Sequence, residues 1–158
     1  MINIRKGEIK DMPQVLGLIQ ELAIFEKEPD AVVIDTEYLI KNGFSNPPSF
    51  YTYVAEIDNR IVGMALFYYR FSTWKGKTIH LEDLIVKQNK RGLGIGKALY
   101  NKVLEFALDK KVKRVEWVVL NWNKNAIEFY KKSGAEILKD WRTVQMTEDK
   151  LKLYLDKK

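Results

Sequence analysis

The sequence predicts one domain of mixed α and β structure (α/β, or α+β) over residues 1–158, with a mostly antiparallel sheet and helices on both faces. The length is that of a single domain, and 46% hydrophobic with 30% charged residues is ordinary for a chain that buries a core. β-rich runs follow one another in the first half, whereas strand and helix patterns alternate in the second. An antiparallel meander that continues through helical connections predicts this mixed architecture.

Local signals place the elements of the first half. Pro13 in the first turn after Asp11 indicates a helix with Asp11 as its cap. Asp58-Asn59 between two β-rich runs is typical of a hairpin turn. The expected elements are a strand 2–5, the helix after Asp11, a shorter helix from Asp35 or Thr36 to about Gly43, strands 50–57 and 61–69, and a loop 71–77.

The second half alternates strands with helical patterns. The hydrophobic run 80–86 predicts a strand, and the pattern 97–109 places Leu99, Val103 and Phe106 on one face of a helix. The remaining expected elements are a strand 112–120, a short helix from Asn123, two closing strands 135–138 and 141–146, and a last short helix capped by Thr147.

The composition limits the classes of function. The chain has no cysteine, which excludes disulfides, a thiol nucleophile and thiolate metal ligands. No apolar run approaches the roughly eighteen residues of a membrane span, and the first residues do not read as a signal peptide. The net charge of +6 comes mostly from scattered lysines, without the pattern of a nucleic-acid module. We therefore expect a cytoplasmic protein that binds neither membrane nor nucleic acid.

A glycine-rich run between the strand 80–86 and the helix 97–109 is the most informative segment: Arg91-Gly92-Leu93-Gly94-Ile95-Gly96. Glycines there let the backbone turn tightly and aim N–H groups at one point, at a helix N-terminus that favours negative charge. A phosphate or pyrophosphate is the expected occupant, with Arg91 adding a charged contact. The run matches neither the Walker A nor the dinucleotide fingerprint, so a plain strand-to-helix turn stays the alternative.

A second motif follows the strand 112–120 and reads Asn123-Lys124-Asn125-Ala126-Ile127-Glu128-Phe129-Tyr130, with Gly134-Ala135 closing it. In this order and spacing, the two motifs resemble the acetyl-CoA-binding core of the GNAT acetyltransferase superfamily. The segments 21–26, 81–83 and 141–142 resemble its diamine (spermidine/spermine) acetyltransferase branch. The similarity covers nearly the whole chain.

The resemblance implies a fold with a splayed pair of strands and a site for acetyl-CoA as co-substrate. It implies direct transfer in a ternary complex, no metal and a homodimer. Side-chain type does not separate a pantetheine-binding strand from an ordinary core strand, because the implied contacts come from its backbone. The implied acetyl-CoA-binding residues are Leu84, Ile85, Val86, Arg91, Gly92, Leu93, Gly94, Ile95, Gly96, Lys97, Asn123 and Ala126.

Two residues carry the implied chemistry. Tyr130 matches the family's catalytic tyrosine, since a phenol with a pKa of about 10 can protonate a departing thiolate with a pKa of about 8.5. Its alternative is a buried aromatic next to Phe129. Glu82 matches a carboxylate that contacts the substrate amine, directly or through water, and is the candidate base; its alternative is an exposed strand carboxylate. Because strand side chains alternate, only one of Glu82 and Asp83 is expected to face the cleft. His80 has no evident partner and is interpreted as structural.

A cationic substrate needs local negative charge on a chain that is basic overall. Phe25 and Glu26 match a substrate-contacting pair of the diamine branch, although Glu26 could instead lie in a solvated loop. Trp117 could pack on a cation or a methylene chain. The implied substrate-binding residues are Phe25, Glu26, Glu82, Glu116, Trp117, Val118 and Asp140.

The sequence therefore predicts an acyl-CoA-dependent N-acetyltransferase for a small cationic amine, either a diamine or polyamine or a thialysine-like compound. Two alternatives stay open. One is acetylation of a protein amine or an aminoglycoside, and the other is a CoA-binding module without turnover.

Overall fold

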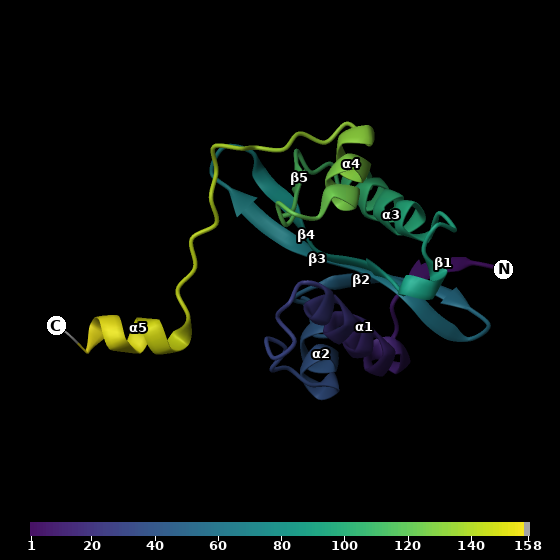
Figure 1. Cartoon of the computed structure of the whole chain (residues 1–158), viewed down its shortest axis with the longest axis horizontal. Helices are drawn as coiled ribbons and strands as arrows, with labels where there is room; N and C mark the ends of the chain where they lie inside the picture. The colour runs from purple at the N-terminus through teal and green to yellow at the C-terminus, as the bar shows by residue number, and fades with distance from the viewer. Residues whose placement is uncertain (157–158) are drawn as a thin grey trace. The chain divides into compact units, whose positions relative to one another are not determined.

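The computed structural model describes residues 1–156, and the chain divides into two units, Met1–Val118 and a second that begins at Val119. The first unit contains a five-stranded sheet in the spatial order β1-β2-β3-β4-β5 (Figure 1). Strands β1 to β4 pair antiparallel, and β5 runs parallel to β4, which confirms the predicted mixed, mostly antiparallel sheet. The strands are β1 (Asn3–Lys6), β2 (Tyr51–Ile57), β3 (Arg60–Ser72), β4 (Gly76–Val86) and β5 (Val115–Glu116).

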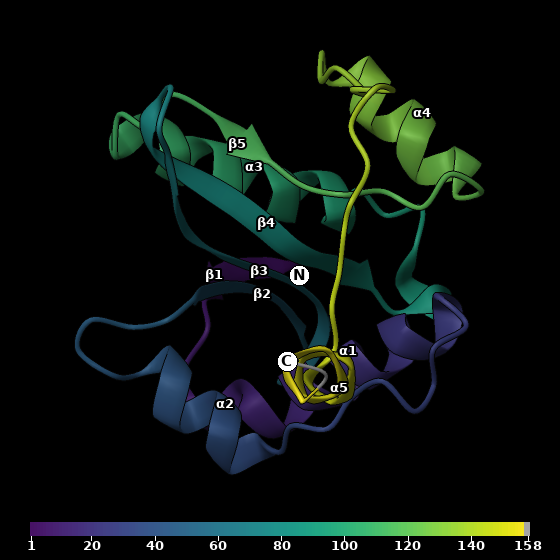
Figure 2. The same cartoon turned by 90° about the vertical axis from the view of Figure 1, so that its left-hand side faces the viewer.

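Helices cover both faces of this sheet, as predicted. The helices α1 (Met12–Phe25) and α2 (Thr36–Gly43) lie on one face, and α3 (Ile95–Asp109) lies on the other (Figures 1 and 2). The core beneath α1 contains fully buried apolar side chains from the helix and from β3, among them Leu18 and Met64. Single 3-10 turns over Ile9–Asp11 and Gln88–Lys90 precede α1 and the glycine-rich loop.

The β2–β3 hairpin turns where the sequence predicts. Asp58 and Asn59 have φ angles of 49° and 60°, the left-handed conformation that a two-residue turn of this type requires. The next connection is tighter than the expected loop 71–77. Pairing of β3 with β4 continues as far as Ser72 opposite Gly76. Each added pair gives further backbone N–H and C=O groups a hydrogen-bond partner, which favours the longer hairpin.

Aspartates occupy the N-cap positions of both α2 and α1, but only one of the two side chains makes a capping bond. Asp35 caps α2, since its Oδ1 accepts a hydrogen bond of 2.7 Å from the backbone N–H of Tyr38. Asp11 is at the predicted N-cap position of α1, but its side chain makes no capping hydrogen bond to that helix. Its carboxylate oxygens instead accept hydrogen bonds from Arg5 and from the backbone N–H of Glu8.

The sheet splays between β4 and β5. These strands pair only at Ile79 with Val115 and at His80 with Glu116. The strand predicted over 112–120 is therefore much shorter, because the chain after Glu116 has no backbone partner on β4. The outer edge of β4 beyond His80 is left without a neighbouring strand.

The second unit contains α4 (Lys124–Lys132) and α5 (Glu148–Leu155). Asn123 caps α4 through its Oδ1, 3.3 Å from the backbone N of Ala126, and Thr147 occupies the N-cap position of α5. The strands predicted at 135–138 and 141–146 are wrong, because a strand needs a paired neighbour and the described part of this unit supplies none. Within residues 1–156, no helix combines the length and apolarity needed to cross a membrane.

Candidate active site

The glycine-rich loop ends at the N-terminus of α3 with unusual backbone angles. Gly92 and Gly94 have φ angles of 81° and 77°, a conformation that side chains disfavour, and Gly94 is the N-cap of α3. No side chain caps this helix, so the N–H groups of Ile95, Gly96 and Lys97 point out of its first turn without an intrahelical acceptor. A Cβ added at Gly92 or Gly94 would meet nothing within 4 Å. The loop is therefore an open cradle of donors that fits a pyrophosphate.

Arg91 joins this loop to two other elements. Its Nε donates a hydrogen bond of 3.1 Å to the carbonyl oxygen of Val86, at the end of β4. Its guanidinium carbon lies 5.5 Å from the centre of the Phe25 ring, at the end of α1. The Arg91 side chain therefore connects the predicted phosphate-binding loop with Phe25, one of the predicted substrate-binding residues.

The predicted pantetheine strand lies on the unpaired edge of the splay. Ile85 is buried in the core beneath α1, whereas Leu84 and Val86 are half-buried. Beyond His80, backbone N–H and C=O groups on the β5 side of β4 have no strand partner. An extended arm that offers amide groups could pair with this edge as an added strand does.

A β-bulge in β4 changes which side chains share a face. Leu66 pairs with Asp83, but its neighbour Phe67 pairs with Leu81, so Glu82 is an extra residue in β4. Leu66 belongs to the core beneath α1, which places its partner Asp83 on that face. The expectation that only one of Glu82 and Asp83 faces the cleft is wrong, because the bulge interrupts the alternation.

Glu82 lies on the same face as Asp83. Its Oε2 accepts a hydrogen bond of 2.8 Å from the hydroxyl of Tyr68, which is two residues beyond Leu66 on β3 and so shares its face. The same oxygen lies 3.5 Å from His80 Nε2. His80 therefore has a polar partner that the sequence did not reveal.

Three carboxylates interact through their charges: Glu26, Glu82 and Asp83, called here the acidic group. Burial, together with the charges of Glu82 and Glu26, raises the pKa of Asp83 to about 7. Burial and the charge of Glu82 also raise the pKa of Glu26. Like charges held in a partly buried site favour binding of a cation, which would relieve the repulsion.

The predicted β5 residues have partners of their own. Both carboxylate oxygens of Glu116 are in ion pairs, Oε1 with Arg70 and Oε2 with Arg114, the latter at 2.8 Å. The ring of Trp117 lies edge-on to Tyr100 from α3, with 5.6 Å between centroids. Val118 is exposed.

Four predicted residues belong to the second unit. Tyr130 lies on α4 beside Phe129, with 5.3 Å between ring centroids, and both rings are half-buried. Asn123 and Ala126 form the cap at the start of the same helix. Asp140 is exposed on the segment between the two helices.

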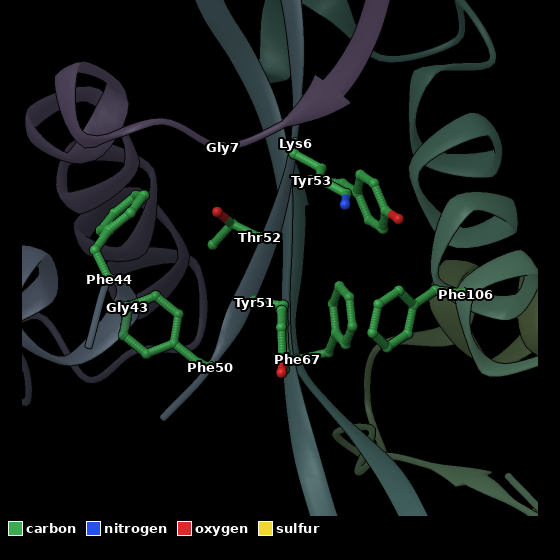
Figure 3. Close-up of a pocket in the computed structure, with 10 residues that line it drawn as sticks. All are labelled: Lys6, Gly7, Gly43, Phe44, Phe50, Tyr51, Thr52, Tyr53, Phe67 and Phe106. Carbon is green, nitrogen blue, oxygen red and sulfur yellow. The ribbon is translucent and has the colours of Figure 1, made fainter. Parts of the chain in front are cut away.

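The first unit also contains a cavity of about 120 Å³. Figure 3 shows Phe44 and Phe50 on one side of β2, and Phe67 and Phe106 on the other. None of the predicted site residues lines it. Among residues 1–156, no group of three or more histidine or carboxylate side chains is placed to hold a metal ion.

Sequence reasoning missed Tyr68 and Arg70. They are two positions apart on β3, so their side chains share one face of the sheet, but this spacing alone only weakly indicates a functional role. Their partners on β4 are revealed only by the register, in which Tyr68 lies opposite His80 and Arg70 opposite Thr78.

Known proteins are similar to this chain in sequence and in fold. Residues 16–135 match the Acetyltransferase (GNAT) family. A thialysine N-epsilon-acetyltransferase of Bos taurus is 42% identical over 145 residues, which are 87% of this chain and 85% of that protein. The human spermidine/spermine N(1)-acetyltransferase-like protein 1 is 34% identical over 84% of this chain, but over 20% of its own length. The structure of a predicted acetyltransferase with acetyl-CoA from Clostridium acetobutylicum has a TM-score of 0.75 at 20% identity, over 92% of this chain and 96% of that one.

The chain therefore belongs to the GNAT family of acetyltransferases, and the resemblance seen in its motifs is confirmed. Within that family of transferases it is similar to the thialysine N-epsilon-acetyltransferases.

Proposed function

We propose that the protein transfers the acetyl group of acetyl-CoA to a primary amine of a small cationic substrate, by direct transfer in a ternary complex. One observation carries the proposal. Arg91 links the open glycine cradle to Phe25, and the next residue, Glu26, belongs to the acidic group. A proposed site for a polyanionic phosphate, at the start of α3, and a proposed site for a cation, at the ends of α1 and β4, are thus connected through Arg91.

The protein's part in acetyl-CoA binding is to supply donors and a strand edge. When bound, acetyl-CoA supplies the activated acetyl group. The residues proposed to hold it in the first unit are the strand edge Leu84–Val86 and the loop Arg91–Lys97. Asn123 and Ala126 are proposed as contacts from the second unit. No metal takes part in this proposal.

The acidic group would bind the amine and remove its proton. An alkylammonium has a pKa of about 10 and does not react until it loses a proton. Glu82 is the proposed base, directly or through water, with Glu26 and Phe25 contacting the rest of the substrate. Asp83 adds a carboxyl that titrates near neutrality. Glu116, Trp117, Val118 and Asp140 are proposed as further substrate contacts, although an amine at Glu116 would compete with two guanidinium groups.

Tyr130 is the proposed acid. Its phenol would give a proton to the departing thiolate, and the thiolate's lower pKa makes this transfer favourable. A Tyr130→Phe variant should turn over at least about tenfold more slowly, while its affinity for CoA is retained.

The named relatives favour a thialysine-like substrate over a polyamine. The thialysine enzymes of Bos taurus and Sus scrofa are each 42% identical, whereas the spermidine/spermine-like protein is 34% identical. An aminoglycoside stays a second candidate, because an aminoglycoside acetyltransferase with sisomicin has a TM-score of 0.72 at 24% identity.

The deciding experiment measures thiol release from acetyl-CoA with thialysine, lysine, ornithine, putrescine, spermidine, spermine, an aminoglycoside and a basic peptide. Turnover of one small cationic amine supports the proposal and selects its branch. Turnover of the peptide alone contradicts it. Tight CoA binding without any turnover indicates a binding module. We further propose a cytoplasmic homodimer, to be tested by sedimentation of the purified chain and by fractionation of cells.

A further inference from the structure

Two side chains converge on one oxygen of Glu82. The Tyr68 hydroxyl donates to Oε2 at 2.8 Å, and His80 Nε2 lies 3.5 Å from the same atom. Their rings are neighbours, with centroids 5.3 Å apart. Within residues 1–156, these are the polar contacts of this carboxylate, so its Oε1 stays open to an incoming group.

The tautomer of His80 follows from its other neighbour. Arg70 Nη1 lies 3.3 Å from His80 Nδ1, and a guanidinium can only donate, so Nδ1 must accept. Burial, with the charge of Arg70, holds the pKa of His80 below its usual value against the opposing effect of Glu82. A neutral ring with Nδ1 accepting carries its proton on Nε2, the nitrogen that lies 3.5 Å from Glu82 Oε2.

Tyr68 keeps its proton over the working range of pH. Burial, together with its hydrogen bond to Glu82 and the charge of that residue, raises its pKa to about 12. The hydroxyl is therefore a permanent donor. It cannot take over the role of a base.

Two ion pairs fix the position of Arg70 beside His80. Arg70 forms an ion pair with Glu116 on β5, and Glu116 is held from its other side by Arg114. Arg70 therefore connects three strands: its ion pair reaches Glu116 on β5, and its contact with Nδ1 reaches His80 on β4, where the sheet splays.

We propose that Tyr68 and His80 are positioning residues for Glu82: they fix its Oε2 and leave Oε1 to receive the proton of the substrate amine. This inference rests on the proposed function of Glu82. The groups that act on Glu82 are then Tyr68 and Arg70 from β3, His80 and Asp83 from β4, and Glu26 at the end of α1. Removing a donor leaves the carboxylate less firmly held.

The test compares Tyr68→Phe with Tyr69→Phe. Tyr69 packs against Tyr51 and Phe106, so its variant is a matched control without a donor to Glu82. The first readout is the NMR signal of the Glu82 side-chain carboxyl carbon in the full chain at fixed pH, with Glu82→Gln to identify the signal. Tyr68→Phe should shift this signal, because the hydrogen bond to Oε2 is lost, while Tyr69→Phe leaves it unchanged.

The second readout is the pH profile of kcat/KM. In Tyr68→Phe this profile should change, with kcat lower by about tenfold and KM for acetyl-CoA unchanged, whereas Tyr69→Phe keeps the wild-type profile. His80→Gln, which keeps an N–H donor, should retain more activity than His80→Leu.

The two proposals fail in different ways. An inactive wild type contradicts the proposed function, yet the NMR signal of Glu82 still decides the positioning. An active wild type whose Glu82 signal and pH profile are the same in Tyr68→Phe and Tyr69→Phe overturns the positioning role.

Discussion

Glu82 and Asp83 are consecutive in the sequence, yet both carboxylates lie on the face of the sheet that α1 covers. Asp83 is the cross-strand partner of Leu66, and Glu82 hydrogen-bonds Tyr68, two residues further along β3. One extra residue in β4 therefore places a second carboxyl group at this point. It also explains why the charge of Glu82 raises the pKa of Asp83.

Replacing Asp83 by Asn should change the pH dependence of stability. The folded-state pKa of about 7 lies above the unfolded value of 3.8, so folding favours the protonated carboxyl. That contribution is complete below the unfolded pKa and is lost as pH rises through 7. At about 1.4 kcal/mol per pKa unit, the wild type should lose on the order of 4 kcal/mol of unfolding free energy between pH 4 and 8, and Asp83→Asn should not lose it. Urea unfolding of both proteins at several pH values measures this, and parallel curves would contradict it.

Glu26→Gln should weaken binding of the amine alone. Losing one charged contact of on the order of 1–2 kcal/mol raises KM for the amine by about tenfold, while KM for acetyl-CoA stays the same. Glu28→Gln is the matched control, because Glu28 is an exposed carboxylate two residues away. Steady-state kinetics at varied amine concentration separate the two variants. Equal effects from both would indicate a general role of surface charge rather than a site at Glu26.

The sequence predicted what local patterns determine and missed what register determines. The hairpin at Asp58-Asn59 and the helix start at Asp35 or Thr36 depend on neighbouring residues, and both are confirmed. The bulge at Glu82 depends on how β4 pairs with β3, which no local pattern encodes. The partners of His80 depend on the same register. The closing strands 135–138 and 141–146 have strand-like composition, but a strand forms only against a partner.

Gly94→Ala should lower both stability and acetyl-CoA affinity. The left-handed conformation at φ 77° costs a residue with a Cβ about 1–2 kcal/mol, and the new methyl projects into the open cradle. KM for acetyl-CoA should rise about tenfold. Gly17→Ala is the control, since Gly17 lies in α1 with nothing within 4 Å of the added Cβ. It should stabilise the fold by about 0.5–1 kcal/mol and leave the kinetics unchanged. A normal KM in the Gly94→Ala variant would show that the cradle does not bind the co-substrate.

Arg5 and Asp11 should behave as one unit in stability. Arg5 Nη1 and Nη2 lie 2.6 and 2.9 Å from the two oxygens of Asp11, whose residue is 2% exposed, and Arg5 Nε lies 2.6 Å from Glu56 Oε2. Burial alone would raise the pKa of Asp11, but its hydrogen bonds to Arg5 and to the Glu8 amide outweigh it, so the pKa is lowered.

The lowered pKa means that Asp11 stabilises the fold above the unfolded pKa of 3.8, and that this contribution is lost as pH falls through the folded value. At neutral pH, Asp11→Asn should cost about 3 kcal/mol, because a partly buried guanidinium loses its counter-charge. Arg5→Gln should cost a similar amount. The loss of unfolding free energy in the double variant should be about 1–2 kcal/mol smaller than the sum of the losses in the two single variants. The reason is that the second substitution removes a group that the first had already left unpaired. Denaturant unfolding of the four proteins gives this coupling energy, and strict additivity would show that the pair does not act as a unit.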